Sequence, residues 1–189
     1  MKEEITGVIL AGGKNSRMGT DKGLLQVDGK IIVERIVEAL KPVVDDLLII
    51  TNGKNYDYLG YKTYNDLVKD CGPMGGIFTA LLHSNTEKNF VVSCDMPFLS
   101  TELIQFIADN ATGCEIAVPR HGEMLEPLCA VYTKKCSNKF ETLLKNKNRK
   151  LQDALKQFNV KEVQIPENIF SAACFANINT PNEYEKIKT

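Results

Sequence analysis

A glycine-rich segment early in the chain carries the residues best suited to bind a triphosphate. It reads LAGGKNSRMGTDKG, starts at Leu10 and holds two adjacent glycines and several cations. Gly12 and Gly13 have no side chains, so backbone N–H groups can approach a phosphate or a base edge closely. Arg17 can place its planar guanidinium on phosphate oxygens, and Lys22 adds a compact positive charge. The segment therefore predicts a phosphate-binding loop.

Two common nucleotide-binding loops do not fit this segment. A Walker A loop requires GxxxxGK[ST] and the dinucleotide fingerprint requires GxGxxG, and the segment has neither spacing. The remaining alternative is a glycine turn whose Lys and Arg side chains are simply solvated. The full string of glycines and cations favours a ligand site over that alternative.

A candidate metal ligand follows the later apolar run FVVSC. Asp95 comes at the tip of this expected strand, and Pro97 ends the strand and fixes the turn. Mg²⁺ binds through one or two carboxylates together with waters and substrate phosphates, so a single Asp is sufficient. The alternative is that Asp95 caps the helix that follows, but Ser100 or Thr101 is better placed for that. We interpret Asp95 as a magnesium ligand.

The cysteines are not expected to do chemistry. Cys94 adjoins Asp95, but strand alternation turns its side chain to the opposite face, into the core. The six cysteines contain no CxxC pair, and disulfides are rare in the cytosol. We expect reduced, structural cysteines. The chain also offers no Ser-His-Asp set that would supply a nucleophile.

Polar residues at the ends of two further expected strands could read a base. Asn52 follows the strand expected at 47–51, and Asp66 follows the one expected at 62–65. Guanine presents N1–H and a 2-amino group as donors, which a carboxylate or amide oxygen can accept. A turn-forming role for Asn52 and Asp66 is nearly as well supported by sequence. The glycine-rich segment 72–76 opens a helix and either brings amides near the base or ribose or only caps the helix.

Three polar residues late in the chain are further candidates for ligand contacts. Asn177 and Asn179 alternate along a short expected strand, so they share one face. Arg149 lies in the basic stretch KNKNRK, where a ligand contact and a solvated loop cation are equally supported. The last helix is expected after Thr180, with Pro181 at its first position.

Strand and helix patterns alternate along the chain, which predicts an α/β fold with a mostly parallel central sheet flanked by helices. A single domain over residues 1–189 is expected. The carboxyl ends of parallel strands form the ligand-binding edge of such sheets. The expected strands are 5–11, 47–51, 62–65, 90–94, 115–118, 128–132 and 160–165. The expected helices are 31–40, 76–84, 101–111, 134–147 and 151–158, with a tight turn at Asp28-Gly29.

The overall charge argues for a small-molecule ligand. Lys plus Arg number 23 and Asp plus Glu number 24. This balance gives no basic field for a nucleic acid, so no nucleic-acid partner is expected. No apolar run approaches the 18 residues of a membrane span, and the N-terminus does not resemble a signal peptide. We expect a soluble, cytoplasmic protein without a membrane partner.

The glycine-rich segment resembles the LAGGxSxRMGxDK signature of the molybdenum cofactor guanylyltransferases. The similarity continues in order through GLLQVDGK, TNG, YND, GPMGG, SCDMP, EPL and FANINTP, and so spans essentially the whole chain. The first and the SCDMP segments are the specific ones. This resemblance implies a Rossmann-like nucleotidyltransferase sandwich.

The resemblance also implies an activity, ligands and site residues. GMP would pass from GTP to the terminal phosphate of molybdopterin, with or without its molybdenum, releasing pyrophosphate and forming molybdopterin guanine dinucleotide. Mg²⁺ would be the cofactor, with Mn²⁺ able to substitute, and contacts with cofactor-delivering proteins and molybdoenzymes would be transient. The implied catalytic residues are Arg17, Lys22 and Asp95. The implied nucleotide-binding residues are Leu10, Ala11, Gly12, Gly13, Lys22, Asn52, Asp66 and Asp95, with Asp95 also on the metal. The implied acceptor-binding residues are Arg149, Asn177 and Asn179.

Two rival functions stay open at this point. The first is a cytidylyltransferase or sugar-phosphate nucleotidylyltransferase of the same fold, although sugar-phosphate enzymes carry GTR where this chain has SRM. The second is a non-catalytic nucleotide sensor or cofactor chaperone. The joint presence of Gly13, Arg17, Lys22 and Asp95 disfavours a site that has lost its activity.

Overall fold

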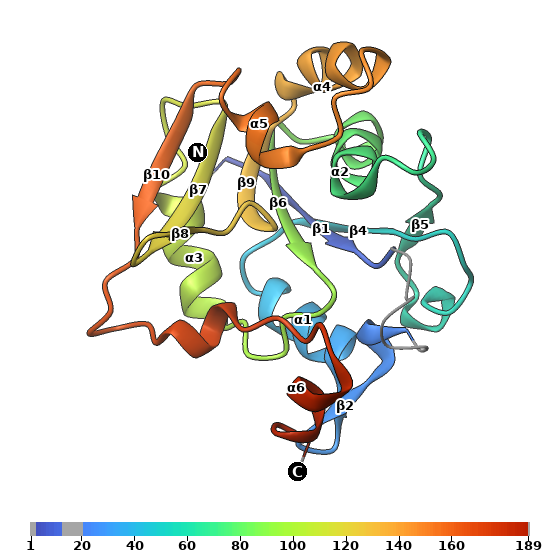
Figure 1. The fold of residues 1–189 in the computed structure, drawn as a ribbon, viewed down its shortest axis with the longest axis vertical. Coiled ribbons are helices and arrows are strands. Elements are labelled where there is room, and N and C mark those ends of the chain that lie inside the picture. The colour runs from blue at the N-terminus through green and yellow to red at the C-terminus, as the bar shows by residue number, and fades with distance from the viewer. Residues whose placement is uncertain (1–2, 13–20, 189) are drawn as a thin grey trace.

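The computed structural model describes residues 3–12 and 21–188. Its centre is an eight-stranded sheet with the order β10-β7-β9-β6-β1-β4-β5, in which β8 pairs with β7 (Figure 1). β9 runs antiparallel to β6 and β7, β8 runs antiparallel to β7, and the other pairs are parallel. The predicted mostly parallel sheet is confirmed. The strands are β1 (Ile5–Leu10), β4 (Asp46–Ile50), β5 (Lys62–Tyr64), β6 (Lys88–Ser93), β7 (Ile116–His121), β8 (Met124–Leu125), β9 (Cys129–Thr133) and β10 (Val160–Gln164).

β1 lies in the middle of the sheet, and its carboxyl end is level with the carboxyl ends of its neighbours β4 and β6. All six of its residues are buried, as expected for a nearly continuous apolar run with both faces covered. Its last residue, Leu10, is in register with Ile50 of β4 and Ser93 of β6. The residues that follow these three strands therefore emerge together at one edge.

Helices cover both faces of the sheet. The core on one face includes residues of α1 and α3, such as Ile36 and Leu103. The core on the other face includes Met74 of α2 and Phe140 of α4, and α2, α4 and α5 lie together above the sheet in Figure 1. The result is the predicted α/β/α sandwich. The helices are α1 (Ile32–Leu40), α2 (Gly72–His83), α3 (Thr101–Asp109), α4 (Cys136–Lys145), α5 (Leu151–Leu155) and α6 (Pro181–Glu185).

Helix α2 begins at Gly72, four residues before the start expected from the sequence. Glycines have poor helix propensity, but here close packing requires them. A Cβ on Gly75 would lie 2.8 Å from the Val68 carbonyl oxygen, and one on Gly76 would lie 3.0 Å from Leu10 Cδ2. Tertiary packing therefore overrides local propensity, and residues 72–76 form the start of the helix.

The short strand expected around Asn177 and Asn179 is wrong. Residues 176–179 form an extended loop, whose Ile178 N–H donates to the Asp95 carbonyl oxygen at 3.0 Å. One such bond makes no ladder, so the alternating pattern does not produce a strand. The helix expected after Thr180 is confirmed as α6, with Thr180 and Glu183 forming a capping box.

The tight turn expected at Asp28-Gly29 is confirmed. Both residues have positive φ, +50° and +70°, as a two-residue hairpin turn requires. The turn joins β2 (Gln26–Val27) and β3 (Lys30–Ile31), a separate small hairpin. Three 3₁₀ turns complete the secondary structure: η1 (Lys22–Leu24), η2 (Asp57–Leu59) and η3 (Ala172–Phe175).

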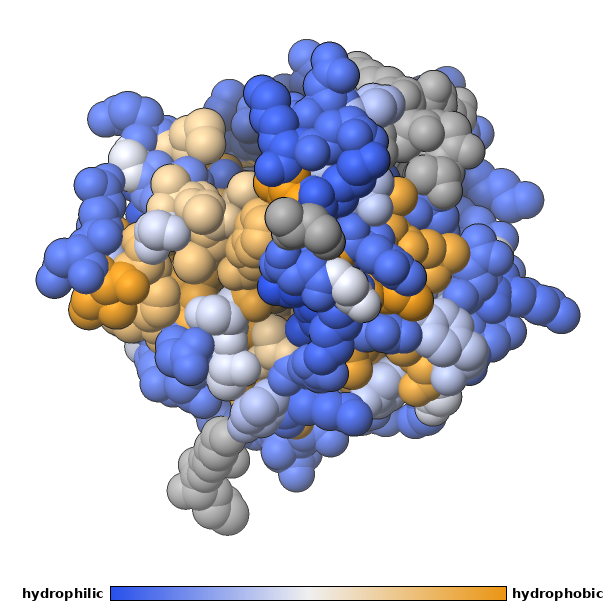
Figure 2. Space-filling view, turned by 90° about the horizontal axis from the view of Figure 1, so that it is seen from below, coloured by the Kyte–Doolittle hydropathy of each residue, from blue (hydrophilic) through white to orange (hydrophobic). Residues whose placement is uncertain are grey.

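Seen from below, the molecule shows apolar side chains on both sides of a hydrophilic band that runs through the middle of the view (Figure 2). Ile169, which follows β10, exposes 66% of its surface, and Met124 of β8 exposes 58%. In residues 3–12 and 21–188, each helix is too short or too polar to span a membrane.

Candidate functional site

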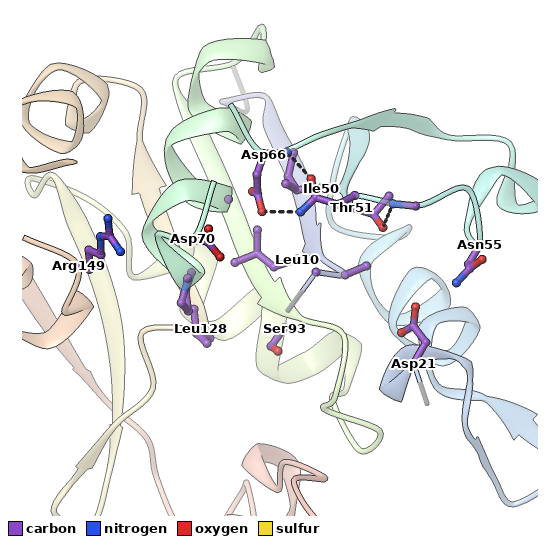
Figure 3. A pocket seen from close by; sticks show the side chains of 17 residues that line it. Leu10, Asp21, Ile50, Thr51, Asn55, Asp66, Asp70, Ser93, Leu128 and Arg149 are labelled. Carbon is purple, nitrogen blue, oxygen red and sulfur yellow. Dashed lines mark hydrogen bonds between the residues drawn. The ribbon is translucent and has the colours of Figure 1, made fainter. Parts of the chain in front are cut away.

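A cleft of about 790 Å³ opens at the carboxyl edge of the sheet, where β1, β4 and β6 end (Figure 3). Its walls come from the segments after β1, β4 and β5, from the start of α2, and from the loop before α5. Six of the residues predicted from the sequence as ligand contacts line it. The lining residues are Leu10, Ala11, Gly12, Asp21, Ile50, Thr51, Asn52, Gly53, Asn55, Asp66, Asp70, Gly72, Pro73, Gly76, Ser93, Leu128 and Arg149.

Asn52 and Asp66 form a hydrogen-bonded pair in this cleft. The Asn52 Nδ2 donates to Asp66 Oδ2, and the Asp66 backbone N–H donates to Asn52 Oδ1, both at 3.1 Å (Figure 3). Among the described residues, Asp66 Oδ1 has no hydrogen-bond partner although it is buried. Burial raises the pKa of Asp66, and the hydrogen bond from Asn52 opposes that shift. The carboxylate is fixed in place yet short of donors.

Two glycines leave room around this carboxylate. A Cβ on Gly76 would lie 3.4 Å from Asp66 Oδ1, and one on Gly12 would lie 3.8 Å from Asp66 Oδ2. Larger side chains at either position would crowd the carboxylate and the cleft beside it. The glycines therefore keep this wall of the cleft open for a flat ligand with N–H donors.

We expect the charge on Asp66 to lower the stability of the unliganded protein. Folding raises the pKa of this carboxyl above its unfolded value, near 3.8, so the protonated carboxyl favours the folded state. This contribution to stability is fully present below pH 3.8 and is lost as pH rises through the folded pKa. Asp66→Asn removes this cost, so the melting temperature should rise at pH 7 but change little at pH 3.5. Thermal unfolding at both pH values checks this, and a lower melting temperature at pH 7 would contradict it.

A second cluster joins three predicted residues from distant parts of the chain. The Lys22 ammonium donates to Asp95 Oδ2 at 3.0 Å and to Asn179 Oδ1 at 2.8 Å. Lys22 comes from η1, Asp95 from the turn after β6, and Asn179 from the loop before α6. This cluster borders the cleft, because Asp21 and Ser93 line it. A cation and a carboxylate therefore lie beside the space for a ligand.

Asp95 does not cap helix α3. Ser100 is the cap residue, and its side chain accepts a hydrogen bond from the Leu103 N–H at 3.2 Å. Asp95 is buried, with 9% of its surface exposed, and its Oδ1 has no hydrogen-bond partner in the described part of the chain. A buried carboxylate oxygen without a donor is costly unless a ligand or a cation satisfies it. This arrangement suits a metal ligand.

The other predicted residues lie around these two groups. Arg149 lines the cleft from the loop between α4 and α5, on the side away from Asn55 in Figure 3. Asn177 lies in the loop that carries Asn179, but its Nδ2 donates locally to the Phe175 carbonyl oxygen at 3.2 Å. Gly13 and Arg17 lie outside the described residues.

The donor set limits how a metal could bind. Over residues 3–12 and 21–188, no three His, Cys, Asp or Glu side chains are grouped to hold a metal ion. A divalent cation at Asp95 would therefore depend on oxygens of a ligand and on water. Mg²⁺ is bound in this way in sites that use substrate phosphates.

Cys94 is a core residue, as expected from strand alternation. It packs in the cluster that contains α1 and α3, and burial raises the pKa of its thiol to about 12. A thiol with so high a pKa is a poor nucleophile at neutral pH. Cys94 is therefore not a candidate nucleophile.

Sequence reasoning did not single out three residues of this region. Asp21 and Asn55 line the cleft, and the fully buried Tyr56 donates a hydrogen bond to Asp21. Asp21 was recognisable as part of the DK pair in the glycine-rich segment. Tyr56 gave no such signal, because the segment after β4 has no periodic pattern.

A family profile described as "MobA-like NTP transferase domain" matches residues 7–163. The chain is 38% identical over 184 residues to a protein of Flavobacterium johnsoniae named "Probable molybdenum cofactor guanylyltransferase", covering 96% of this chain and 95% of that one. It is 36% identical over 188 residues to a protein of the same name from Carboxydothermus hydrogenoformans, covering 98% and 95%.

A solved structure has the same fold. The molybdopterin-guanine dinucleotide biosynthesis protein A of Archaeoglobus fulgidus superposes with a TM-score of 0.82 at 26% identity. The match covers 97% of this chain and 96% of that one. Sequence and fold therefore agree over nearly the full length of these relatives.

Proposed function

Because the chain belongs to the MobA-like NTP transferase family, we propose that it transfers GMP from GTP to the terminal phosphate of molybdopterin. The chain is a nucleotidyltransferase, and the relatives named above are molybdenum cofactor guanylyltransferases. The products are molybdopterin guanine dinucleotide and pyrophosphate. The arrangement of Lys22 and Asp95 beside a cleft that carries Asp66 supports this proposal.

The acceptor needs no activated side chain. A phosphate monoester has a second pKa of about 6, so it is largely a dianion at neutral pH. One of its oxygens attacks the α-phosphorus of GTP and forms the new P–O bond. The bond from the α-phosphorus to the α–β bridging oxygen breaks, and its electron pair leaves on pyrophosphate. The protein aligns the two phosphates and neutralises their charge.

Lys22 and Arg17 would supply positive charge directly, and Asp95 would contribute through a bound cation. Lys22 and Arg17 would hold the leaving pyrophosphate, and Lys22 would exchange Asp95 for phosphate oxygens as GTP enters. Asp95 would hold Mg²⁺, since its buried Oδ1 lacks a partner among the described residues. Mg²⁺, or Mn²⁺ in its place, neutralises phosphate charge when bound. Arg149 and Asn179 are the candidates for contacts with the acceptor.

The observation that carries the proposal is the meeting of Lys22, Asp95 and Asn179 at the edge of the cleft. Pyrophosphate release tests it, with GTP, CTP and ATP each supplied with Mg²⁺ and molybdopterin. Release should require molybdopterin and should be fastest with GTP, and calorimetry should show tighter binding of GTP than of CTP. Equal affinity for CTP would refute the guanylyl assignment, and no release with any nucleotide would favour a sensor or chaperone.

Asp66→Asn should change which base is accepted. Guanine offers two N–H donors, and two hydrogen bonds to a charged carboxylate contribute about 1.5–3 kcal/mol each. The new amide would present an N–H group to one of those donors, so GTP affinity should fall by roughly tenfold to a hundredfold. Xanthosine triphosphate (XTP) has a carbonyl oxygen in place of the 2-amino group of guanine. That oxygen can accept from the N–H group of the new amide, so the affinity for XTP should rise.

Calorimetry with GTP and XTP measures this exchange of preference. Asp109→Asn is a matched control, because Asp109 is an exposed carboxylate at the end of α3 that bonds to Gln105. The control should bind both nucleotides as the wild type does. Unchanged GTP affinity in Asp66→Asn would remove Asp66 from the base site.

A further inference from the structure

We infer that Tyr56 and Asp21 act together as positioning residues that hold Lys22 in the place required for transfer. The catalytic meaning of this inference rests on the proposed role of Lys22 in binding the triphosphate. Neither Tyr56 nor Asp21 has to touch the reacting phosphates, because both act through the backbone turn that carries the lysine.

The first support is the hydrogen bonding around Asp21. The Tyr56 hydroxyl donates to Asp21 Oδ1, and the same oxygen accepts the Gly23 backbone N–H at 3.2 Å. Asp21 is thereby the N-cap of η1, whose first residue is Lys22. A single carboxylate oxygen therefore joins the tyrosine to the turn that carries the lysine.

The second support is the packing of Gly23. A Cβ on Gly23 would lie 2.6 Å from the Tyr56 hydroxyl oxygen and 3.2 Å from Cys94 Cβ. The turn is therefore in close contact with both the tyrosine and the residue before Asp95. Cys94 and Tyr56 are buried, so the turn packs against a fixed surface at the end of β6. This packing places the backbone of Lys22 close to Asp95, to which its ammonium bonds at 3.0 Å.

The third support is where Tyr56 lies in the chain. It belongs to the loop after β4, in which Asn52, Gly53 and Asn55 line the cleft. Tyr56 has no exposed surface, and burial raises the pKa of its hydroxyl, which keeps the group a donor. The contact with Asp21 therefore ties the loop on the base side of the cleft to the turn on the phosphate side.

The kinetic test is a double-mutant cycle. Tyr56→Phe removes one hydrogen bond to a charged group, so the turnover number for pyrophosphate release should fall about tenfold. If Tyr56 acts through Lys22, the variant with both Tyr56→Phe and Lys22→Ala should be no slower than Lys22→Ala alone. A double variant slower by the product of the two single effects would overturn the inference.

Hydrogen exchange tests the same contact without the reaction. The Leu24 and Leu25 N–H groups bond to the Asp21 and Lys22 carbonyl oxygens at 3.2 Å. Their exchange should become faster in Tyr56→Phe, while the core strands stay protected. The matched control is Tyr132→Phe, which also removes a buried hydroxyl, bonded to the Pro127 carbonyl oxygen at 2.7 Å. That control should leave exchange at the turn unchanged.

The outcomes separate the two proposals. An inactive wild type would refute the proposed function, while faster exchange at Leu24 and Leu25 would still support the positioning contact. Unchanged exchange there would overturn the contact, whatever the activity. Should Tyr56→Phe fail to fold, Asp21→Ala probes the contact from the other side, because alanine has no oxygen to accept from the Tyr56 hydroxyl or the Gly23 N–H. A fully active Asp21→Ala with unchanged exchange would again overturn it.

Discussion

Asp95→Asn is expected to lower the rate of GMP transfer by a factor on the order of a thousand while the protein stays folded. A loss of this size is typical of removing one preorganised electrostatic contact from a transfer reaction. An amide preserves the shape of the side chain, so some GTP binding should remain. A neutral ligand binds a hard cation weakly, so the charge that develops on the phosphates goes uncompensated. Pyrophosphate release measured across Mg²⁺ concentrations gives the size of the loss.

The response to metal distinguishes the causes of that loss. Raising Mg²⁺ should restore only part of the rate, and Mn²⁺ should restore more, because it accepts neutral ligands more readily. Asp109→Asn should keep the wild-type rate at every metal concentration. Ser100 already caps α3, so no capping role of Asp95 can produce a loss. A full rate in Asp95→Asn would end the metal-site hypothesis.

Lys22→Ala is expected to remove most activity, roughly a hundredfold to a thousandfold, through weaker binding of the triphosphate. The ammonium is the group that bonds to both Asp95 and Asn179 in the unliganded protein, with 21% of its side chain exposed. Without it, the phosphates lose the cation that pairs with Asp95, and Arg17 and bound Mg²⁺ alone would have to neutralise their charge. Calorimetry should show a higher dissociation constant for GTP, and pyrophosphate release should show a lower turnover number.

Two comparisons make this result specific. Lys156→Ala removes the lysine that follows α5 and pairs with Asp153 at 3.0 Å, and it should leave activity unchanged. Lys22→Ala should stay folded, but its melting temperature should be lower than that of the wild type, because the buried Asp95 loses its cation. Wild-type turnover in Lys22→Ala would show that the glycine-rich segment binds something other than the phosphates.

The sequence predicted the sheet well because its strands carry a strong local signal. β1 (ITGVIL) is a short, nearly continuous apolar run and β6 (KNFVVS) has an apolar centre, which is typical of buried parallel strands. The rule that such strands end at one edge was enough to bring Asp95 near the glycine-rich segment. The cap of α3 was narrowed to Ser100 or Thr101 from their positions before the helix, and the structure has Ser100.

Contacts between distant loops could not be predicted in this way. Asn179 reaches Lys22 across 157 residues, and the loop that carries it has no ladder to fix its direction. The alternation of Asn177 and Asn179 suggested a strand, but alternation cannot show whether a neighbouring strand is present to pair with it. The Tyr56–Asp21 contact depends on a loop conformation that no periodic pattern encodes.

The strand order has a consequence for how the protein is made. The half-sheet β6-β1-β4-β5 is built entirely from residues before Cys94, and it carries Asn52 and Asp66 at its edge. A chain emerging from the ribosome therefore completes this half before β9 exists, and domains fold from the N-terminus during synthesis. The segment that supplies Asn179 is translated after all of these strands. A nascent chain stalled before that segment can pair Lys22 with Asp95 but lacks the amide that completes the cluster.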